Sequence, residues 1–200
     1  MFKTLIFDLG QVIVPFDFKR GYARMEPLCS YPAADIPARL RTTDLVTRFE
    51  TGQVEPEHFV EELSRILELK TSYAEFCDLW TSIFLPEPLI PEAFLAGLKE
   101  RYRLVLLSNT NAIHFEMIER HYPLIRHFKH RVLSYKVGAL KPSPKIYEAA
   151  LAEAECRPEE CFFTDDIAAY VEGAQRHGIQ AVQFQSFEQL HRDMQSRGIL

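Results

Sequence analysis

Short apolar runs separated by helix-like stretches constrain the fold of this chain more than any other feature. Three runs are brief, rich in β-forming residues and closed by a polar or turn-forming residue; they cover residues 5–7, 104–107 and 161–163. Two further runs of the same kind lie at 131–133 and 181–184. Apolar runs of this length are typical of strands that are buried on both faces of a sheet.

Helical spacing of apolar residues fills the stretches between these runs. Helices are predicted at 92–101, 112–121, 144–155 and 168–177. Ser143 followed by Pro144 is a helix-start signal, and Gly178 is expected to end the last of these helices. Strands that alternate with helices of this length form βαβ units. We therefore predict an α/β fold with a Rossmann-like parallel sheet and helices on both faces, formed by residues 1–14 and 86–200.

Residues 15–85 follow a different pattern, because they contain no convincing strand. Apolar side chains recur at helical spacing, as at Phe59 and Leu63, and Ser72 with Glu75 matches a capping box. Prolines close the stretch on its C-terminal side. A purely helical block inserted directly after the first strand is predicted to form a small cap domain over the carboxyl end of that strand.

Composition and charge exclude several classes of protein. The 200 residues include 23 Lys and Arg against 28 Asp and Glu, so the formal net charge is −5. With no run of basic residues, binding to nucleic acid or to an anionic membrane is not expected. The four cysteines form no CxxC pair, and the N-terminus resembles neither a signal peptide nor a spanning helix. A cytoplasmic protein is expected, as a monomer or a homodimer.

Polar residues follow the carboxyl ends of three predicted strands. Asp8 comes after the first strand, the segment 108–111 after the second, and Asp165 with Asp166 after the third. Lys141 lies in the segment that leads into the third strand. Because ligands of open parallel sheets bind beyond the carboxyl ends of the strands, these groups are expected to converge on one crevice. Adjacent carboxylates also repel each other and call for a cation.

Transfer of a phosphoryl group needs this combination of side chains. A carboxylate nucleophile can attack phosphorus and form an acyl-phosphate, which water later hydrolyses. Three carboxylates beside a phosphate dianion require a hard cation, and oxygen ligands suit Mg²⁺. Lys141 would offset the remaining charge, while the Ser108 hydroxyl and N–H groups at a helix start would hold phosphoryl oxygens. The expected substrate is a small-molecule phosphate ester.

Four segments, in this order along nearly the whole chain, resemble the motifs of one family. They are residues 7–12, 107–110, 141–142 and 163–166. The chain resembles the haloacid dehalogenase-like hydrolase superfamily, and within it the phosphatase-like branch with a helical cap after the first strand. The start at Asp8 and the segment 108–111 also resemble those of bacterial α-glucose-1-phosphate phosphatases.

The resemblance implies a role for each matching residue. Asp8 would be the nucleophile, Ser108 and Asn109 would bind the transferring phosphoryl group, and Lys141 would orient and screen it.

It also implies a set of metal ligands. Asp8, Asp165 and Asp166 would hold Mg²⁺, together with the backbone carbonyl of Gly10.

Two positions depart from the pattern of the family. Typical phosphatases carry a second aspartate two residues after the nucleophile as general acid and base, and this chain has Gly10 there. Since a positioned acid–base contributes typically 10²–10⁴-fold, its loss predicts a slower enzyme, a leaving group that departs with little help, or a substitute donor. The candidates for a substitute are His114 and Asp17. Relatives often carry asparagine where this chain has Tyr170, and that amide commonly supports the metal-site loop around Asp165.

Substrate selection is expected to depend on the cap. Phe16, Arg20, Arg48 and Glu50 are candidate contributors. The leading hypothesis is a Mg²⁺-dependent phosphatase acting on a small phosphorylated metabolite, with a sugar phosphate as one candidate, through an aspartyl-phosphate at Asp8. The first alternative is a catalytically impaired protein that binds a phosphorylated ligand or a partner. The second is a metal-independent 2-haloacid dehalogenase, against which the retained acidic pair argues.

Overall fold

A five-stranded parallel sheet forms the centre of the structure, a computed structural model that describes residues 1–200. The strand order is β3-β2-β1-β4-β5. The strands are β1 (Thr4–Phe7), β2 (Arg103–Ser108), β3 (His130–Leu133), β4 (Cys161–Asp165) and β5 (Gln180–Gln183). All four pairings are parallel, which confirms the predicted α/β fold.

Each inner strand buries side chains on both faces of the sheet, as its continuous apolar run predicts. In β1, Leu5 and Phe7 belong to one core cluster, whereas Ile6 belongs to another on the opposite face. Successive side chains of a strand point to opposite faces, so a strand covered on both sides must be apolar at every position. This is why the runs do not alternate with polar residues.

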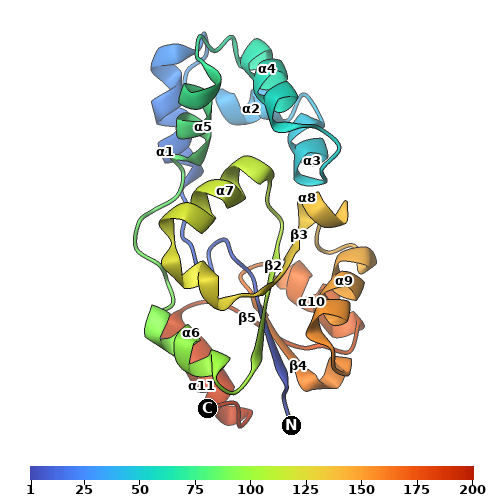
Figure 1. Cartoon of the computed structure of the whole chain (residues 1–200). Coiled ribbons are helices and arrows are strands. Elements are labelled where there is room, and N and C mark those ends of the chain that lie inside the picture. Colours follow the sequence, from blue (N-terminus) through green and yellow to red (C-terminus); the bar gives the residue numbers. More distant parts are fainter.

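Helices cover both faces of the sheet (Figure 1). Side chains of α6, α7 and α11 pack in the first of these clusters, and side chains of α9 and α10 in the second. These helices, with the short α8, are α6 (Glu92–Lys99), α7 (Ala112–His121), α8 (Ser134–Val137), α9 (Pro144–Ala154), α10 (Ala168–Arg176) and α11 (Phe187–Ser196). Two 3₁₀ turns, η2 (Pro123–His127) and η3 (Pro158–Glu160), precede β3 and β4.

The predicted helix ends are met to within a few residues. Gly178 has a φ of +79° just after α10, a left-handed conformation that glycine adopts without steric cost. Ser143 stands before α9 with Pro144 at its first position, but its side chain caps no backbone N–H. The start of α9 therefore depends on the fixed φ of the proline rather than on a serine cap.

A second helical layer is formed by residues between β1 and α6, and it lies beyond the carboxyl ends of the strands (Figure 1). It has a core cluster of its own around Phe59, Phe76 and Trp80, with Ile113 of α7 added from below. Its elements are α1 (Phe18–Met25), η1 (Glu26–Leu28), α2 (Ile36–Leu40), α3 (Leu45–Glu50), α4 (Pro56–Leu67) and α5 (Tyr73–Thr81). The division of the chain at residues 15 and 85 stays a prediction.

None of the helices is long and apolar enough to span a bilayer. The order of the strands reverses at β1, since β2 and β3 lie on one side of it and β4 and β5 on the other. In open α/β sheets, ligands bind beyond the carboxyl ends of the strands at such a switch point. A ligand site is therefore expected beyond the carboxyl ends of β1 and β4.

Candidate active site

Three carboxylates meet at this switch point. Asp8 directly follows β1, Asp165 ends β4, and Asp166 comes next. Phe7 and Thr164 are paired in register, so Asp8 and Asp165 stand at the same level of the sheet. One carboxylate oxygen from each aspartate lies within 4.8 Å of the other two. Asp8 and Asp165 are buried and Asp166 is half-buried. The sequence-based expectation that these groups converge is met by the geometry.

The ammonium of Lys141 lies between two of these carboxylates. Its Nζ is 2.7 Å from Asp8 Oδ1 and 2.5 Å from Asp165 Oδ2, and it also donates to the carbonyl oxygen of Leu107 (3.2 Å). Lys141 as a whole residue is only 3% exposed. Burial lowers the pKa of Lys141, but Asp8 and Asp165 outweigh burial, and its net pKa lies above the usual value. Lys141 is therefore a fixed positive charge inside the site.

The aspartates respond to the same environment. Burial raises the pKa of Asp8 to about 7, although the ammonium of Lys141 works in the opposite direction. Burial, and then the neighbouring Asp165, raises the pKa of Asp166. Both shifts reflect burial first of all, and the charge of Lys141 offsets it only in part. One ammonium faces three carboxylates, and full ionisation would leave two negative charges.

A divalent cation fits this set of groups. Asp8 and Asp166 each keep a carboxylate oxygen that does not contact Lys141. Asp165 has none to spare, because its Oδ2 contacts Lys141 and its Oδ1 accepts from the backbone N–H of Ile167 (2.9 Å). The carbonyl oxygen of Gly10 accepts no hydrogen bond from the chain. Carboxylate and backbone oxygens are the ligands that Mg²⁺ uses in proteins, and two uncompensated negative charges match its charge.

Ser108 and Asn109 lie beside this cluster at the end of β2. Ser108 is buried, and its hydroxyl has only a long contact with the Asn109 carbonyl oxygen (3.4 Å). The amide of Asn109 is engaged on both sides: its Oδ1 accepts from the backbone N–H of Lys141 (2.7 Å), and its Nδ2 donates to the Lys141 carbonyl oxygen (3.2 Å). The Asn109 side chain thus holds the loop that presents Lys141.

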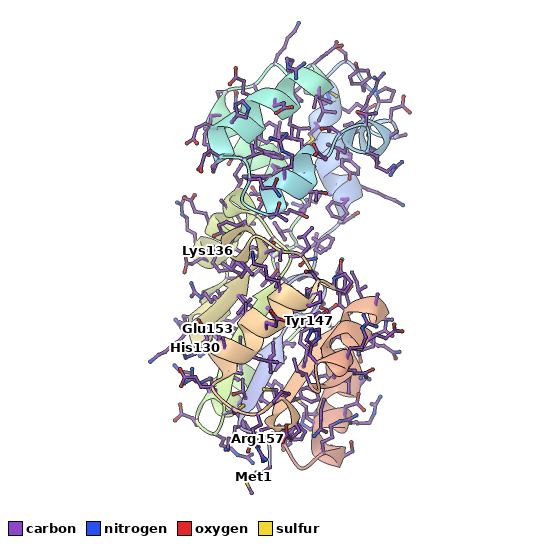
Figure 2. All side chains as sticks on the ribbon, turned by 90° about the vertical axis from the view of Figure 1, so that its right-hand side faces the viewer. Met1, His130, Lys136, Tyr147, Glu153 and Arg157 are labelled. Atoms are coloured by element: carbon purple, nitrogen blue, oxygen red, sulfur yellow. The ribbon has the colours of Figure 1, made fainter.

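Tyr170 supports the same loop. Its ring lies 5.1 Å from Lys141 Nζ, and its hydroxyl oxygen accepts from Asn109 Nδ2 (3.4 Å). Tyr147 of α9, labelled in Figure 2, donates its hydroxyl to the carbonyl oxygen of Tyr170 (2.7 Å). Sequence reasoning missed Tyr147, because a tyrosine on an apolar helix face is not distinguishable from a core residue.

Neither predicted substitute for the missing acid lies free in this crevice. His114 is 8% exposed; its Nε2 lies 3.1 Å from the carbonyl oxygen of Trp80. Burial lowers the pKa of His114 to about 4, so the ring is neutral at physiological pH. Asp17 is exposed and accepts from the backbone N–H of Lys19 (2.9 Å) as the N-cap of α1. Both residues have structural roles, and a surface or capping role is also what the sequence favours for each of them over a catalytic one.

The helical layer is in close contact with α8, which follows β3. Gly52 has a φ of +68°, and a Cβ on it would stand 2.0 Å from the carbonyl oxygen of Tyr135. Lys136 of α8, labelled in Figure 2, marks the level at which the two parts meet. Glu50, at the end of α3, is half-buried with no ion-pair or hydrogen-bond partner, and burial raises its pKa to about 7. Whether Glu50 contacts a substrate stays a prediction.

Comparisons with known proteins agree with this geometry. The model of the haloacid dehalogenase-like hydrolase family matches residues 2–178. The chain is 26% identical over 192 residues to a D-ribitol-5-phosphate phosphatase of Bacteroides thetaiotaomicron, with 92% of each chain covered. It is 27% identical to a phosphatase of Mycobacterium tuberculosis, with 90% of this chain and 85% of that protein covered.

A solved structure has the same fold. The crystal structure of a family enzyme of Bacteroides thetaiotaomicron, in complex with magnesium and inorganic phosphate, superposes with a TM-score of 0.82 at 25% identity, covering 94% of this chain and 96% of that one. The match to the family model extends over most of the chain and includes the residues that form the acidic crevice. The chain belongs to the haloacid dehalogenase-like hydrolase family.

Proposed function

We propose that this hydrolase is a Mg²⁺-dependent phosphatase that hydrolyses a small phosphorylated metabolite through an aspartyl-phosphate on Asp8. One observation carries the proposal: an ammonium and three carboxylates from distant parts of the chain meet within a few ångströms. An arrangement with two excess negative charges is costly to bury without a cation, and it has no evident structural use.

Asp8 is the residue placed to attack. Its carboxylate follows a buried strand, so its backbone is held by the sheet, and its backbone N–H donates to the carbonyl oxygen of Thr164 (3.0 Å). Lys141 fixes Asp8 Oδ1. The second lone pair of Oδ1 would serve the cation, which leaves Oδ2 for phosphorus. Attack forms a bond between the Asp8 oxygen and phosphorus while the bond to the leaving oxygen breaks, and water later hydrolyses the acyl-phosphate.

Magnesium would be held by Asp8, Asp166 and the carbonyl oxygen of Gly10, with Asp165 beside them. When bound, it would neutralise carboxylate and phosphoryl charge so that a carboxylate can approach a phosphate dianion. Ser108, at the buried end of β2, would bind a phosphoryl oxygen through its hydroxyl, which has no strong partner of its own. Relatives named as phosphatases support this assignment.

The test is a phosphate-release screen over a broad panel of phosphorylated metabolites, run with Mg²⁺ and with a chelator. We expect release that requires Mg²⁺ and that is abolished in Asp8→Asn. Asp17→Asn is the matched control, because it removes the same charge at an exposed position while an asparagine still caps α1. Acid-quenched protein should carry the mass of one phosphoryl group on Asp8.

The outcomes separate the alternatives. Binding of phosphorylated ligands without turnover would favour an impaired, ligand-binding member of the family. Halide release from 2-haloacids without metal would favour a dehalogenase and contradict the phosphatase. The resemblance to α-glucose-1-phosphate phosphatases stays a prediction that the same panel addresses.

A further inference from the structure

An aromatic ring stands where the missing acid would have to be. A Cβ on Gly10 would lie 2.8 Å from Phe16 Cε1, closer than van der Waals contact allows, and 3.5 Å from Phe16 Cδ1, an ordinary contact distance. Gly10 is two residues after Asp8, which is one of the three clustered aspartates. This chain has no acidic side chain at position 10, and the ring of Phe16 occupies the space that such a side chain would need.

The Phe16 ring is held in this place from several sides. It packs against the ring of Phe18 at a centroid distance of 4.9 Å and edge-on against Phe84 at 6.2 Å. The backbones of Phe16 and Phe84 form an antiparallel bridge, which joins the two segments leading into and out of the helical layer. Gln11 donates its side-chain amide to the carbonyl oxygen of Phe16 (2.7 Å). Rotation of the ring away from Gly10 would disturb these packed contacts.

Neither of the two substitutes considered above is set up to give a proton to a leaving oxygen. The ring of His114 is turned to Trp80, and Asp17 caps α1 in solvent. Glu50, at the end of α3, makes no hydrogen bond or ion pair with the groups around Asp8. The hydroxyl oxygen of Tyr170 accepts from Asn109 Nδ2, and burial raises the pKa of this hydroxyl, which makes it a weaker proton donor. Lys141 is held by two carboxylates that keep it protonated.

We infer that the substrates of this site are phosphate esters whose leaving oxygen departs as a weakly basic oxyanion, unprotonated by the protein. This inference rests on the proposed phosphatase function and narrows its substrate class. Enolic, anomeric and aryl phosphates share this chemistry, whereas esters of ordinary alcohols do not. Phe16, whose ring lies against the Gly10 position, and the half-exposed Phe18 packed on it would form an aromatic surface for the departing group.

The step balances without a protein acid. As the Asp8 oxygen bonds to phosphorus, the bond to the leaving oxygen breaks and its electron pair stays on that oxygen, which takes a proton from water after departure. In the second half, a water oxygen bonds to phosphorus, the bond to Asp8 breaks, and the water proton passes to solvent. Because this half also lacks a protein base, the aspartyl-phosphate is expected to accumulate.

A leaving-group series tests the inference on the wild-type protein. Substituted phenyl phosphates, from dinitrophenyl to unsubstituted phenyl, keep the phosphoryl group and ring constant while the leaving oxygen becomes more basic. We expect kcat/KM to fall by about 10²-fold or more along the series, the range that a positioned acid would otherwise contribute. The kcat values of the best leaving groups should converge, because hydrolysis of the aspartyl-phosphate then limits turnover. Benzyl phosphate, similar in size to phenyl phosphate but an alcohol ester, should be slower still.

The possible results are distinct. A steep fall with activity lost in Asp8→Asn supports both the phosphatase function and the inference. A flat series that still requires Asp8 overturns the inference and leaves the phosphatase function standing. Absence of any Asp8-dependent release from the whole series overturns both.

A pair of variants tests the part assigned to Phe16. Gly10→Asp alone should keep the steep series, because the ring excludes the new carboxyl group from its place. Gly10→Asp combined with Phe16→Ala should reduce the ratio of kcat/KM between the two ends of the series by at least tenfold. Phe16→Ala alone should leave that ratio unchanged. Equal flattening by Gly10→Asp alone would contradict exclusion by Phe16. Because slopes along the series are compared rather than absolute rates, a general loss of activity does not obscure the result.

Discussion

The imidazole of His114 stacks on the indole of Trp80, with ring centroids 5.3 Å apart and planes inclined by 16°. Since a carbonyl oxygen can only accept, the contact of Nε2 with the Trp80 carbonyl oxygen (3.1 Å) assigns the ring proton to Nε2. Nδ1 then accepts from the side-chain amide of Asn111 (3.1 Å). Trp80 lies in α5 and His114 in α7, so a neutral histidine joins the helical layer to the helix that follows β2.

Removal of His114 is expected to weaken the dependence of stability on pH. Burial lowers its pKa to about 4 in the folded protein, against about 6.5 in an unfolded chain. The unfolded state therefore binds the proton first as the pH falls, and the free energy of unfolding should decrease between about pH 6.5 and pH 4. In urea unfolding at pH 7.5 and pH 5, this residue should contribute about 2 kcal/mol of the difference.

Its matched control is the exposed His121 on the same helix. His114→Gln should lose part of the pH dependence, and His121→Gln should keep it. Identical pH profiles for the wild type and His114→Gln would contradict the assignment.

Replacement of Glu50 by glutamine is expected to stabilise the protein at high pH. Burial raises the pKa of Glu50 to about 7, so the folded state holds the proton to a higher pH than the unfolded state does. Stability associated with this group is present below about pH 4.5 and is lost as the pH rises through about 7. Glu50→Gln should therefore raise the free energy of unfolding by about 1–3 kcal/mol at pH 8 and change it little at pH 4.5. The exposed Glu57→Gln is the control, and a gain of the same size there would assign the effect to net charge alone.

Alanine at Gly52 is expected to destabilise the contact between the helical layer and α8. Its φ of +68° disfavours a side chain by about 1–2 kcal/mol, and the Cβ would also push against Tyr135 O. Thermal unfolding should show a lower melting temperature. The KM for substrate should rise, because the helical layer is then held less firmly against α8. Gly97→Ala is the matched control, because Gly97 lies inside α6 with no atom within 4 Å of a new Cβ. That change should stabilise the protein by about 0.5–1 kcal/mol. Similar losses in both variants would contradict the close contact at Gly52.

Loss of the Lys141 charge is expected to destabilise the fold as well as abolish activity. Lys141→Met leaves Asp8 and Asp165 buried without their partner, a change that costs about 3–5 kcal/mol for buried ion pairs. Chemical unfolding at pH 8 measures this loss. Addition of Asp165→Asn should recover part of it, because one of the unpaired carboxylates is then removed. A single variant as stable as the wild type would show that the carboxylates are not strained by their proximity.

Magnesium is expected to stabilise the Lys141→Met variant more than the wild type. Without the ammonium, the crevice is more negative, and a ligand that binds only the folded state stabilises it according to its affinity. Melting temperatures with and without Mg²⁺, compared between the two proteins, give the difference. An equal or smaller shift in the variant would argue against a cation site formed by these aspartates.

Local pattern was sufficient to predict the sheet and the convergence of the charged groups. An apolar run such as 104–107 can be buried on both faces only as an inner strand, and parallel strands place their carboxyl ends on one edge. The meeting of Asp8, Asp165 and Lys141 follows from that rule, together with the order of the motifs. These inferences need only the identity of the residues and their order along the chain.

Tertiary packing decided what the remaining residues do. Nothing near Gly10 in sequence reveals that Phe16 closes the space beside it, because that ring is positioned by Phe18 and by Phe84, which lies on a distant segment. In the same way, His114 has the chemistry of a proton donor, but its ring is buried and bonded to the carbonyl oxygen of Trp80. The sequence by itself determined which chemical groups would gather at the strand ends, because strand periodicity is local. Only the tertiary structure decided which of them face the crevice, because side-chain orientation depends on contacts with residues far away in the chain.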